Sequence, residues 1–274
     1  MDYVPRRVLT QAFGRLSRAE LVDRLHALRA LGAVRGVQFV DERGHPRTID
    51  IALKPWVLTN RQLMWFHRVA QELADALMRL PALYAQVPAV REVLRFDQDL
   101  ASWLLLARHP QSRPLAVVGR LDSTALYDHV GWRRDFRMLE PNAVGVGGIH
   151  YAPAASGILL DVVGDVLARA LPGRTISPTP DPRSLLLEEL TAVARRLGRP
   201  LRTVALVENT DYTTGTDEFG QLARYLVGHG VQALVVDPRR LRVRRGVVSV
   251  GTLPIDLVYR DCELKEFVEM EHGG

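Results

Sequence analysis

The sequence predicts a mixed fold of the α+β / α/β class, with a helical N-terminal region, an antiparallel sheet and a Rossmann-like layered region in that order. Two observations lead to this prediction. Apolar residues recur at helical spacing in the first third of the chain, and strand-forming runs take over from about residue 100. Beyond residue 182, helices and strands alternate, which is typical of a parallel sheet covered by helices. We therefore expect regions over 1–95, 96–171 and 172–274.

The first region is expected to contain two capped helices with a hairpin between them. Ser17-Arg-Ala-Glu20 is a capping box before regularly spaced leucines, and it predicts a helix over 18–31. Thr59-Asn-Arg-Gln62 opens a second helix, whose broad apolar stripe is expected to be buried. Between them, two strand-forming runs flank a polar turn, Val34–Val40 and Arg47–Leu53. The aromatic side chains expected in the core are Trp56, Trp65 and Phe66.

The middle region is expected to form an antiparallel sheet followed by a long helix. Its strand-forming runs are Leu100–Leu106, Leu115–Leu121 and Phe136–Leu139. A glycine-rich segment then leads into a helix over about 154–170. The proline-rich stretch 172–182 is the expected joint with the last region.

The last region has the alternation of a layered α/β domain. The expected elements are a helix over 182–197, a strand Thr203–Val207, a helix over 217–229 and a strand Val231–Val236. A hairpin within 241–250 and a strand Ile255–Tyr259 are expected to follow.

Composition indicates an ordinary water-soluble globular protein. Of the 274 residues, 47% are hydrophobic and 24% charged, and the most apolar segment, Gly145–Leu171, is interrupted by charges, so we expect no membrane span. Arginines are scattered among 31 acidic residues, which does not predict a nucleic-acid partner. The single cysteine, Cys262, excludes an internal disulfide and fits a cytoplasmic location. The oligomeric state stays open.

Four polar residues on two strand-forming segments are the candidate site. Arg120 and Asp122 share one face of their strand, and Glu140 and Asn142 share one face of theirs, because side chains alternate along a strand. If the strands pair, two carboxylates, an amide oxygen and a guanidinium converge. Mg²⁺ would compensate the charge, since it takes oxygen ligands from one or two carboxylates together with water and phosphate. The alternative is a surface hairpin with a solvated charged face and Arg120 paired to Asp122 or Glu140, and spacing alone favours this alternative.

Two further groups of residues are candidates for binding. Glycines beside the second segment allow the backbone to approach an anion closely, and they are Gly145, Gly147 and Gly148. Glu208 and Asp211 follow a predicted parallel strand at its carboxyl end, where open α/β sheets place ligands, so they are candidate substrate contacts. Thr216 or Asp217 is expected to cap the next helix.

A family resemblance is carried by the segments GRLD (119–122), LEPNAVGVGG (139–148), VALVENTDYTTGTDEFGQ (204–221) and GTLPIDLVYRD (251–261). In this order they resemble the circularly permuted ATP-grasp proteins related to glutathionylspermidine synthase, from about Phe96 to Tyr259. The resemblance implies an ATP-grasp-like antiparallel sheet, followed by a Rossmann-like layered (pre-ATP-grasp) domain.

The resemblance also implies an activity and its cofactors, ATP and Mg²⁺. Asp122, Glu140 and Asn142 would ligate Mg²⁺, and Arg120 would stabilise the transferring phosphoryl group. Enzymes of this class use ATP to turn a carboxylate into an acylphosphate, which an amine captures as an amide. The implied partners are therefore a small-molecule carboxylate and an amine.

Two features depart from the family pattern. Pro141 lies inside the second motif and removes a backbone donor, so the motif is expected at a strand end or edge. The lysine-bearing lobe of the family follows the layered domain, whereas the lysines of this chain are Lys54 and Lys265. We therefore expect a chain without that lobe. It is either a ligase whose missing lobe is supplied elsewhere or a non-catalytic ligand-binding module derived from the family.

Overall fold

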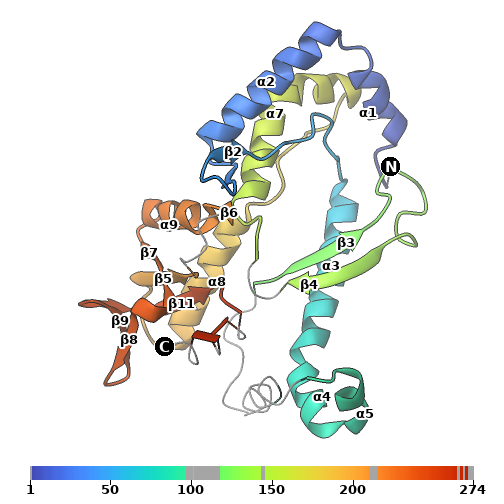
Figure 1. Cartoon of the computed structure of the whole chain (residues 1–274). Helices are drawn as coiled ribbons and strands as arrows, with labels where there is room; N and C mark the ends of the chain where they lie inside the picture. Colours follow the sequence, from blue (N-terminus) through green and yellow to red (C-terminus); the bar gives the residue numbers. More distant parts are fainter. Residues whose placement is uncertain are drawn as a thin grey trace.

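In the computed structural model, a long helix, α7 (Tyr151–Ala170), forms the centre of the helical part of the molecule, and α1 (Arg6–Phe13) and α2 (Arg18–Val34) pack against it (Figure 1). The structure describes residues 2–96, 101, 118–142, 146–209, 215–263, 266–267 and 269–270. The apolar side chains of α7, among them Ile158 and Val163, are buried in this contact. An ion pair of 2.9 Å between Arg24 and Asp165 joins the polar faces of α2 and α7.

The composition of α7 follows from this central position. Among the described helices it alone is long and apolar enough, by length and composition, to cross a membrane. Because α1 and α2 cover it, its apolar character is that of a core helix.

The two capping boxes begin helices where the sequence predicts them. At the start of α2, Ser17 Oγ accepts from the Glu20 amide at 3.2 Å and the Ser17 amide donates to the Glu20 carboxylate at 2.8 Å. At the start of α3 (Asn60–Met78), Thr59 and Gln62 make the same reciprocal pair. Two short helices follow α3, α4 (Leu80–Gln86) and α5 (Pro88–Val93).

The apolar stripe predicted on α3 lies on the predicted face but is half-buried, so the expectation that it is buried is wrong in degree, and the fully buried residue of this helix is Gln62. Trp56 is 69% exposed, so its predicted place in the core is also wrong. Trp65 and Phe66 are half-buried and pack on rings from the segment that follows residue 125. The ring centroids of Trp65 and Trp132 are 5.1 Å apart in an edge-on arrangement.

The N-terminal hairpin is shorter than its apolar runs and gains a third strand from far along the chain. Its strands are β1 (Gln38–Val40) and β2 (Pro46–Thr48). The short strand β6 (Gly215–Thr216) pairs antiparallel with β1, with Phe39 opposite Thr216. This pairing joins the N-terminal region to the C-terminal region of the chain.

Two antiparallel strands, β3 (Arg120–Thr124) and β4 (Arg137–Asn142), carry the candidate motifs. The strand predicted at Leu115–Leu121 begins only at Arg120 among the described residues and continues to Thr124. The strand predicted at Leu100–Leu106 lies, apart from Ala101, outside the described residues.

The layered region has the predicted order. Strand β5 (Thr203–Val207) lies between β11 (Leu257–Arg260) and β7 (Gln232–Val236), and both neighbours run parallel to it. Every residue of β5 is buried, which explains its unbroken apolar run. Helices α8 (Pro182–Arg196) and α9 (Glu218–Gly228) pack on this sheet through apolar side chains that include Leu186 and Leu222.

A further antiparallel sheet lies in the chain between β7 and β11 of the layered sheet. It consists of β8 (Leu241–Arg244), β9 (Val247–Val250) and β10 (Leu253–Ile255). Cys262, just after β11, is a free and buried side chain in the small core between the two sheets.

Candidate functional site

The pairing of β3 with β4 brings the four predicted polar residues to one face. Arg120 lies opposite Asn142, and Asp122 lies opposite Glu140. Arg120 Nε and Nη2 donate to the two oxygens of Asp122 at 2.6 and 3.1 Å, and Asn142 Nδ2 donates to Glu140 at 3.5 Å. The sequence predicted this convergence only on the condition that the two strands are neighbours.

Pro141 fits this arrangement. It lies opposite Leu121, on the alternate position of the ladder, and β4 has a single neighbouring strand among the described residues. A proline is tolerated in such an edge strand because the unpaired edge of the strand has no ladder hydrogen bonds to lose.

The charges of the face are coupled. Hydrogen bonds from Arg120 hold the pKa of Asp122 below its ordinary value, and Asn142 and Glu140 contribute to the same lowering. The pKa of Arg120 is raised, mainly by its hydrogen bonds to Asp122 and further by the charges of Glu140 and Glu218. Asp122 is therefore ionised at neutral pH, as a metal ligand must be.

The described part of the glycine segment lies against the guanidinium. Arg120 Nη1 donates to the Gly147 carbonyl oxygen at 3.0 Å. A side chain at Gly147 would begin 3.4 Å from Arg120 Nη1, and Gly148 has a φ of +95°, where residues with a side chain are strained. Gly145 lies outside the described residues.

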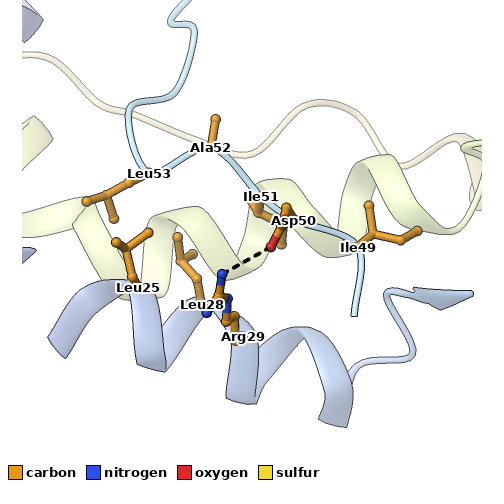
Figure 2. A pocket seen from close by; sticks show the side chains of 8 residues that line it. All are labelled: Leu25, Leu28, Arg29, Ile49, Asp50, Ile51, Ala52 and Leu53. Atoms are coloured by element: carbon orange, nitrogen blue, oxygen red, sulfur yellow. Dashed lines mark ion pairs between the residues drawn. The ribbon is translucent and has the colours of Figure 1, made fainter. Parts of the chain in front are cut away.

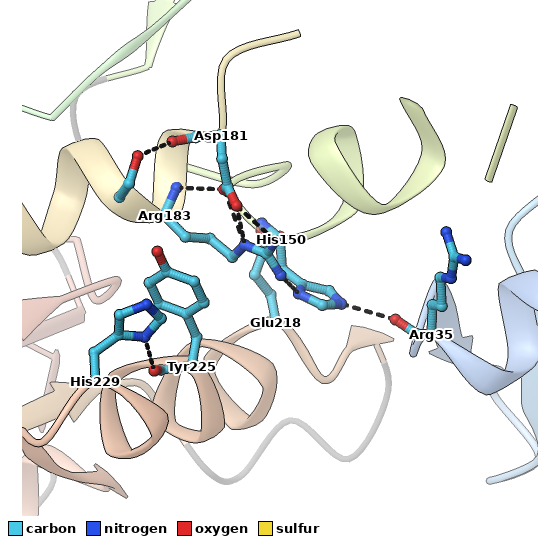
Figure 3. A network of polar contacts seen from close by, with 8 residues as sticks. Arg35, His150, Asp181, Arg183, Glu218, Tyr225 and His229 are labelled. Carbon is cyan, nitrogen blue, oxygen red and sulfur yellow. Dashed lines mark hydrogen bonds and ion pairs between the residues drawn. The ribbon is translucent and has the colours of Figure 1, made fainter. Parts of the chain in front are cut away.

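Glu218, in the first turn of α9, is a residue whose role the sequence did not indicate. Its side chain accepts hydrogen bonds from the amides of Gly148 at 2.8 Å and His150 at 2.6 Å. Figure 3 shows Glu218 beside His150. An acidic residue in the first turn of a helix is common, so the sequence holds no local signal for these contacts. The neighbouring Asp217 occupies the N-cap position, as one of the two alternatives for this helix predicted. Its side chain makes no capping hydrogen bond. It pairs instead with Arg224 at 2.7 Å.

His150 connects the same loop to two other helices. Its Nδ1 lies 3.4 Å from Arg183 Nη1, and its Nε2 lies 3.0 Å from the carbonyl oxygen of Arg35 (Figure 3). Because a guanidinium only donates, Nδ1 is the acceptor and Nε2 carries the proton. Burial, with Arg183 nearby, lowers the pKa of His150, so the ring is neutral at neutral pH.

A second group of acidic residues lies at the carboxyl ends of β5 and β11. Glu208 is half-buried, and this burial, with the charges of Asp261 and Asp217, raises its pKa to about 7. Asp261 itself has a raised pKa, mainly through burial. Open α/β sheets bind ligands at the carboxyl ends of their strands, and Glu208 lies at the carboxyl end of β5 as the sequence predicted. Asp211 lies outside the described residues.

The donor set on β3 and β4 suits one kind of metal. Within the described ranges no cluster of three or more His, Cys, Asp or Glu side chains is arranged to hold a metal ion. The set of Asp122, Glu140 and Asn142 is different in kind, because it offers two carboxylates and one amide oxygen. Hard oxygen donors of this type match Mg²⁺, which keeps part of its water shell and needs few protein ligands.

A separate pocket lies beside α2. Leu25 and Leu28 of α2 face Ile51 across it, and Arg29 pairs with Asp50 at 3.6 Å along its border (Figure 2). Its volume is about 200 Å³. None of the candidate residues lines it.

Comparisons with known proteins show the fold of the chain. No known family profile and no curated protein matches the sequence. Among solved structures, a glutathione synthetase-like effector from Globodera pallida in its apo form matches with a TM-score of 0.67 and 12% sequence identity. The match covers 97% of this chain and 61% of that chain, so this chain spans about three fifths of the length of its structural relative. At this identity the likeness shows a glutathione synthetase-like fold.

Proposed function

We propose that this chain carries the magnesium- and phosphate-binding part of an ATP-grasp-type carboxylate–amine ligase, of the circularly permuted kind. One observation carries the proposal: the strand register that aligns Arg120 with Asn142 and Asp122 with Glu140 on one face. The glutathione synthetase-like fold supports it, since a ligase-related fold has the layers that such a site requires.

The chemistry proposed for this face is charge neutralisation. Asp122, Glu140 and Asn142 would hold Mg²⁺, which when bound neutralises the phosphates of ATP. Arg120 has five N–H donors, of which three are used in its bonds to Asp122 and Gly147, so two remain for a phosphoryl oxygen. Because Asp122 and Gly147 fix the guanidinium, little reorganisation is needed when charge develops on that oxygen.

The substrates proposed for the site are a small carboxylate and an amine. ATP would turn the carboxylate into an acylphosphate, and the amine would displace the phosphate to form an amide. Glu208 is the proposed contact for the amine, because a carboxyl that titrates near pH 7 can bind an ammonium group and accept its proton. Asp211 is proposed for the same substrate pocket, and a cytoplasmic location suits an ATP-dependent enzyme.

The test is a titration of the chain with Mn²⁺, used as a probe of the magnesium site, in the presence and absence of ATP and followed by electron paramagnetic resonance. Asp122→Ala combined with Glu140→Ala is expected to abolish saturable Mn²⁺ binding while the circular dichroism spectrum stays unchanged. The control removes two exposed acids of α8, Glu188→Ala with Glu189→Ala, and keeps Mn²⁺ binding. Equal binding by both double variants would remove the metal site from the proposal.

A second function, a non-catalytic ligand-binding module, is favoured by the pairing of Arg120 with Asp122 and by the small number of lysines. In that case Glu208 and its neighbours would bind a ligand without any nucleotide. The same titration separates the two, because a binding module of this kind shows no Mn²⁺-dependent binding of ATP.

A further inference from the structure

Glu218 is a buried carboxylate with an unusual set of partners. It is 6% exposed, and its two oxygens accept hydrogen bonds from the amides of Gly148 and His150. Burial raises the pKa of Glu218, and these amides oppose the rise by stabilising its charged form. Two N–H groups of one loop, those of Gly148 and His150, are therefore directed at one side chain. A carboxylate suits this position because it only accepts, whereas a glutamine would turn an N–H₂ group toward the donors.

The loop that Glu218 holds also holds Arg120. The Gly147 carbonyl, one residue before the first of these amides, accepts from Arg120 Nη1 at 3.0 Å. A side chain at Gly147 would lie 3.4 Å from Arg120 Nη1 and 3.9 Å from Glu218 Oε2, so the guanidinium and the carboxylate flank the same glycine. The negative charge of Glu218 also stabilises the charged form of Arg120.

We infer that Glu218 is the positioning residue of the β3–β4 site: its carboxylate fixes the loop 147–150 and, through the Gly147 carbonyl, the orientation of Arg120. The inference rests on the proposed function only for its predicted effect on Mn²⁺ and ATP binding. The link from Glu218 to Arg120 rests on contacts within this chain. Glu218 acts through Arg120 and is assigned no contact with substrate.

The His150 end of the loop is held by contacts that do not involve Glu218, so loss of the Glu218 carboxylate is not expected to unfold the chain. His150 is tied to Arg183 and to the Arg35 carbonyl by its ring, independently of Glu218 (Figure 3). Loss of the Glu218 carboxylate therefore frees the Gly147–Gly148 end of the loop first. The guanidinium of Arg120 then loses the Gly147 carbonyl, the second of its two fixed partners, and keeps Asp122.

The experiment follows the Nε–H resonance of Arg120 by ¹⁵N NMR, assigned from its absence in Arg120→Lys, together with Mn²⁺ affinity. Glu218→Gln is expected to shift and broaden this resonance and to weaken Mn²⁺ binding in the presence of ATP by about 10- to 100-fold, the usual effect of losing a residue that orients a ligand. Glu20→Gln is the matched control. Glu20 also accepts a backbone amide at the start of a helix, but it does so at α2, so both readouts stay at their wild-type values.

Each outcome decides the inference. An unchanged Arg120 resonance in folded Glu218→Gln overturns it, whatever the Mn²⁺ affinity. A shifted resonance in a chain that never binds Mn²⁺ supports the positioning link and refutes the proposed function instead. If Glu218→Gln does not fold, Glu218→Asp takes its place, because it keeps both acceptor oxygens but withdraws them by one methylene, and a wild-type Arg120 resonance in that variant also overturns the inference.

Discussion

At the scale of the residue, Glu208 shows how position alone changes acid strength. Its carboxyl group is half-buried beside Asp261 and Asp217, and its pKa rises from 4.5 to about 7. Between pH 4.5 and about 7, Glu208 is therefore protonated in the folded chain and ionised in the unfolded chain. The contribution of this group to stability is present below pH 4.5 and is lost as the pH rises through about 7.

Glu208→Gln is expected to raise the melting temperature at pH 8 and to change it little at pH 5. At pH 8 the wild-type side chain is a poorly solvated anion near two acids, while at pH 5 it is neutral like the amide. For a half-exposed group the gain is about 1 kcal/mol, or roughly 2–4 °C. Thermal unfolding at the two pH values measures it, with the exposed Glu189→Gln as the control. A gain of equal size at both pH values would contradict the assigned pKa.

At the scale of the element, the orientation of the β3–β4 hairpin depends on α3. Gln62, the buried residue of α3, donates from Nε2 to the carbonyl oxygen of Tyr127 at 2.7 Å and accepts from the Thr59 amide at 3.0 Å. One side chain thus completes the capping box of a helix and holds the segment that joins the two strands of the candidate site.

Gln62→Ala is expected to lower the free energy of unfolding by about 1–3 kcal/mol, because it leaves the part-buried Tyr127 carbonyl and the Thr59 amide without their side-chain partner. Urea denaturation provides the measurement. Gln71→Ala, on the exposed face of the same helix, is the control for the lost glutamine and is expected to have little effect. A Gln62 variant as stable as the Gln71 variant would show that this contact contributes nothing to stability.

At the scale of the whole molecule, contacts between distant segments join the helical and layered parts. β6 pairs with β1, Glu218 binds the loop before α7, and His150 of that loop reaches the carbonyl of Arg35 after α2. These contacts connect β1 and the start of α7 to β6 and α9, which lie in the C-terminal part of the chain. We therefore expect the two parts to unfold together.

Ile158→Ala, at a fully buried position of α7, tests this expectation. The cavity is expected to cost about 2–5 kcal/mol. If the parts unfold together, hydrogen exchange of the β5 amides accelerates as much as that of α2, although Ile158 belongs to the helical core. Leu185→Ala, an exposed leucine of α8, is the control. Unchanged protection of β5 in Ile158→Ala would mean that the layered part is an independent folding unit.

Locally coded features could be predicted from the sequence. β5 has the predicted bounds because an unbroken run of five buried residues, four of them apolar, has few alternatives. α2 and α3 begin at their capping boxes since each box satisfies its own backbone donors within four residues. For the site, the period of a strand sufficed to place Arg120 with Asp122 and Glu140 with Asn142.

Features set by distant contacts could not be predicted. The pairing of β6 with β1 joins residues more than a hundred positions apart, and Glu218 lies 70 positions from Gly148. No local pattern encodes either contact. The exposure of Trp56 and the single buried residue of α3 depend in the same way on what packs against each face. The register of β3 against β4 likewise required the folded chain.

The loop 147–150 continues directly into α7 at Tyr151, so the backbone that supports Arg120 and the main core helix form one mechanical unit. Tolerance to mutation should therefore not divide neatly into interior and ligand-facing positions. A genetic screen for loss of the proposed activity should recover large-to-small substitutions of buried α7 residues as well as substitutions on the β3–β4 face. Second-site suppressors of the α7 substitutions should be larger side chains that refill the core.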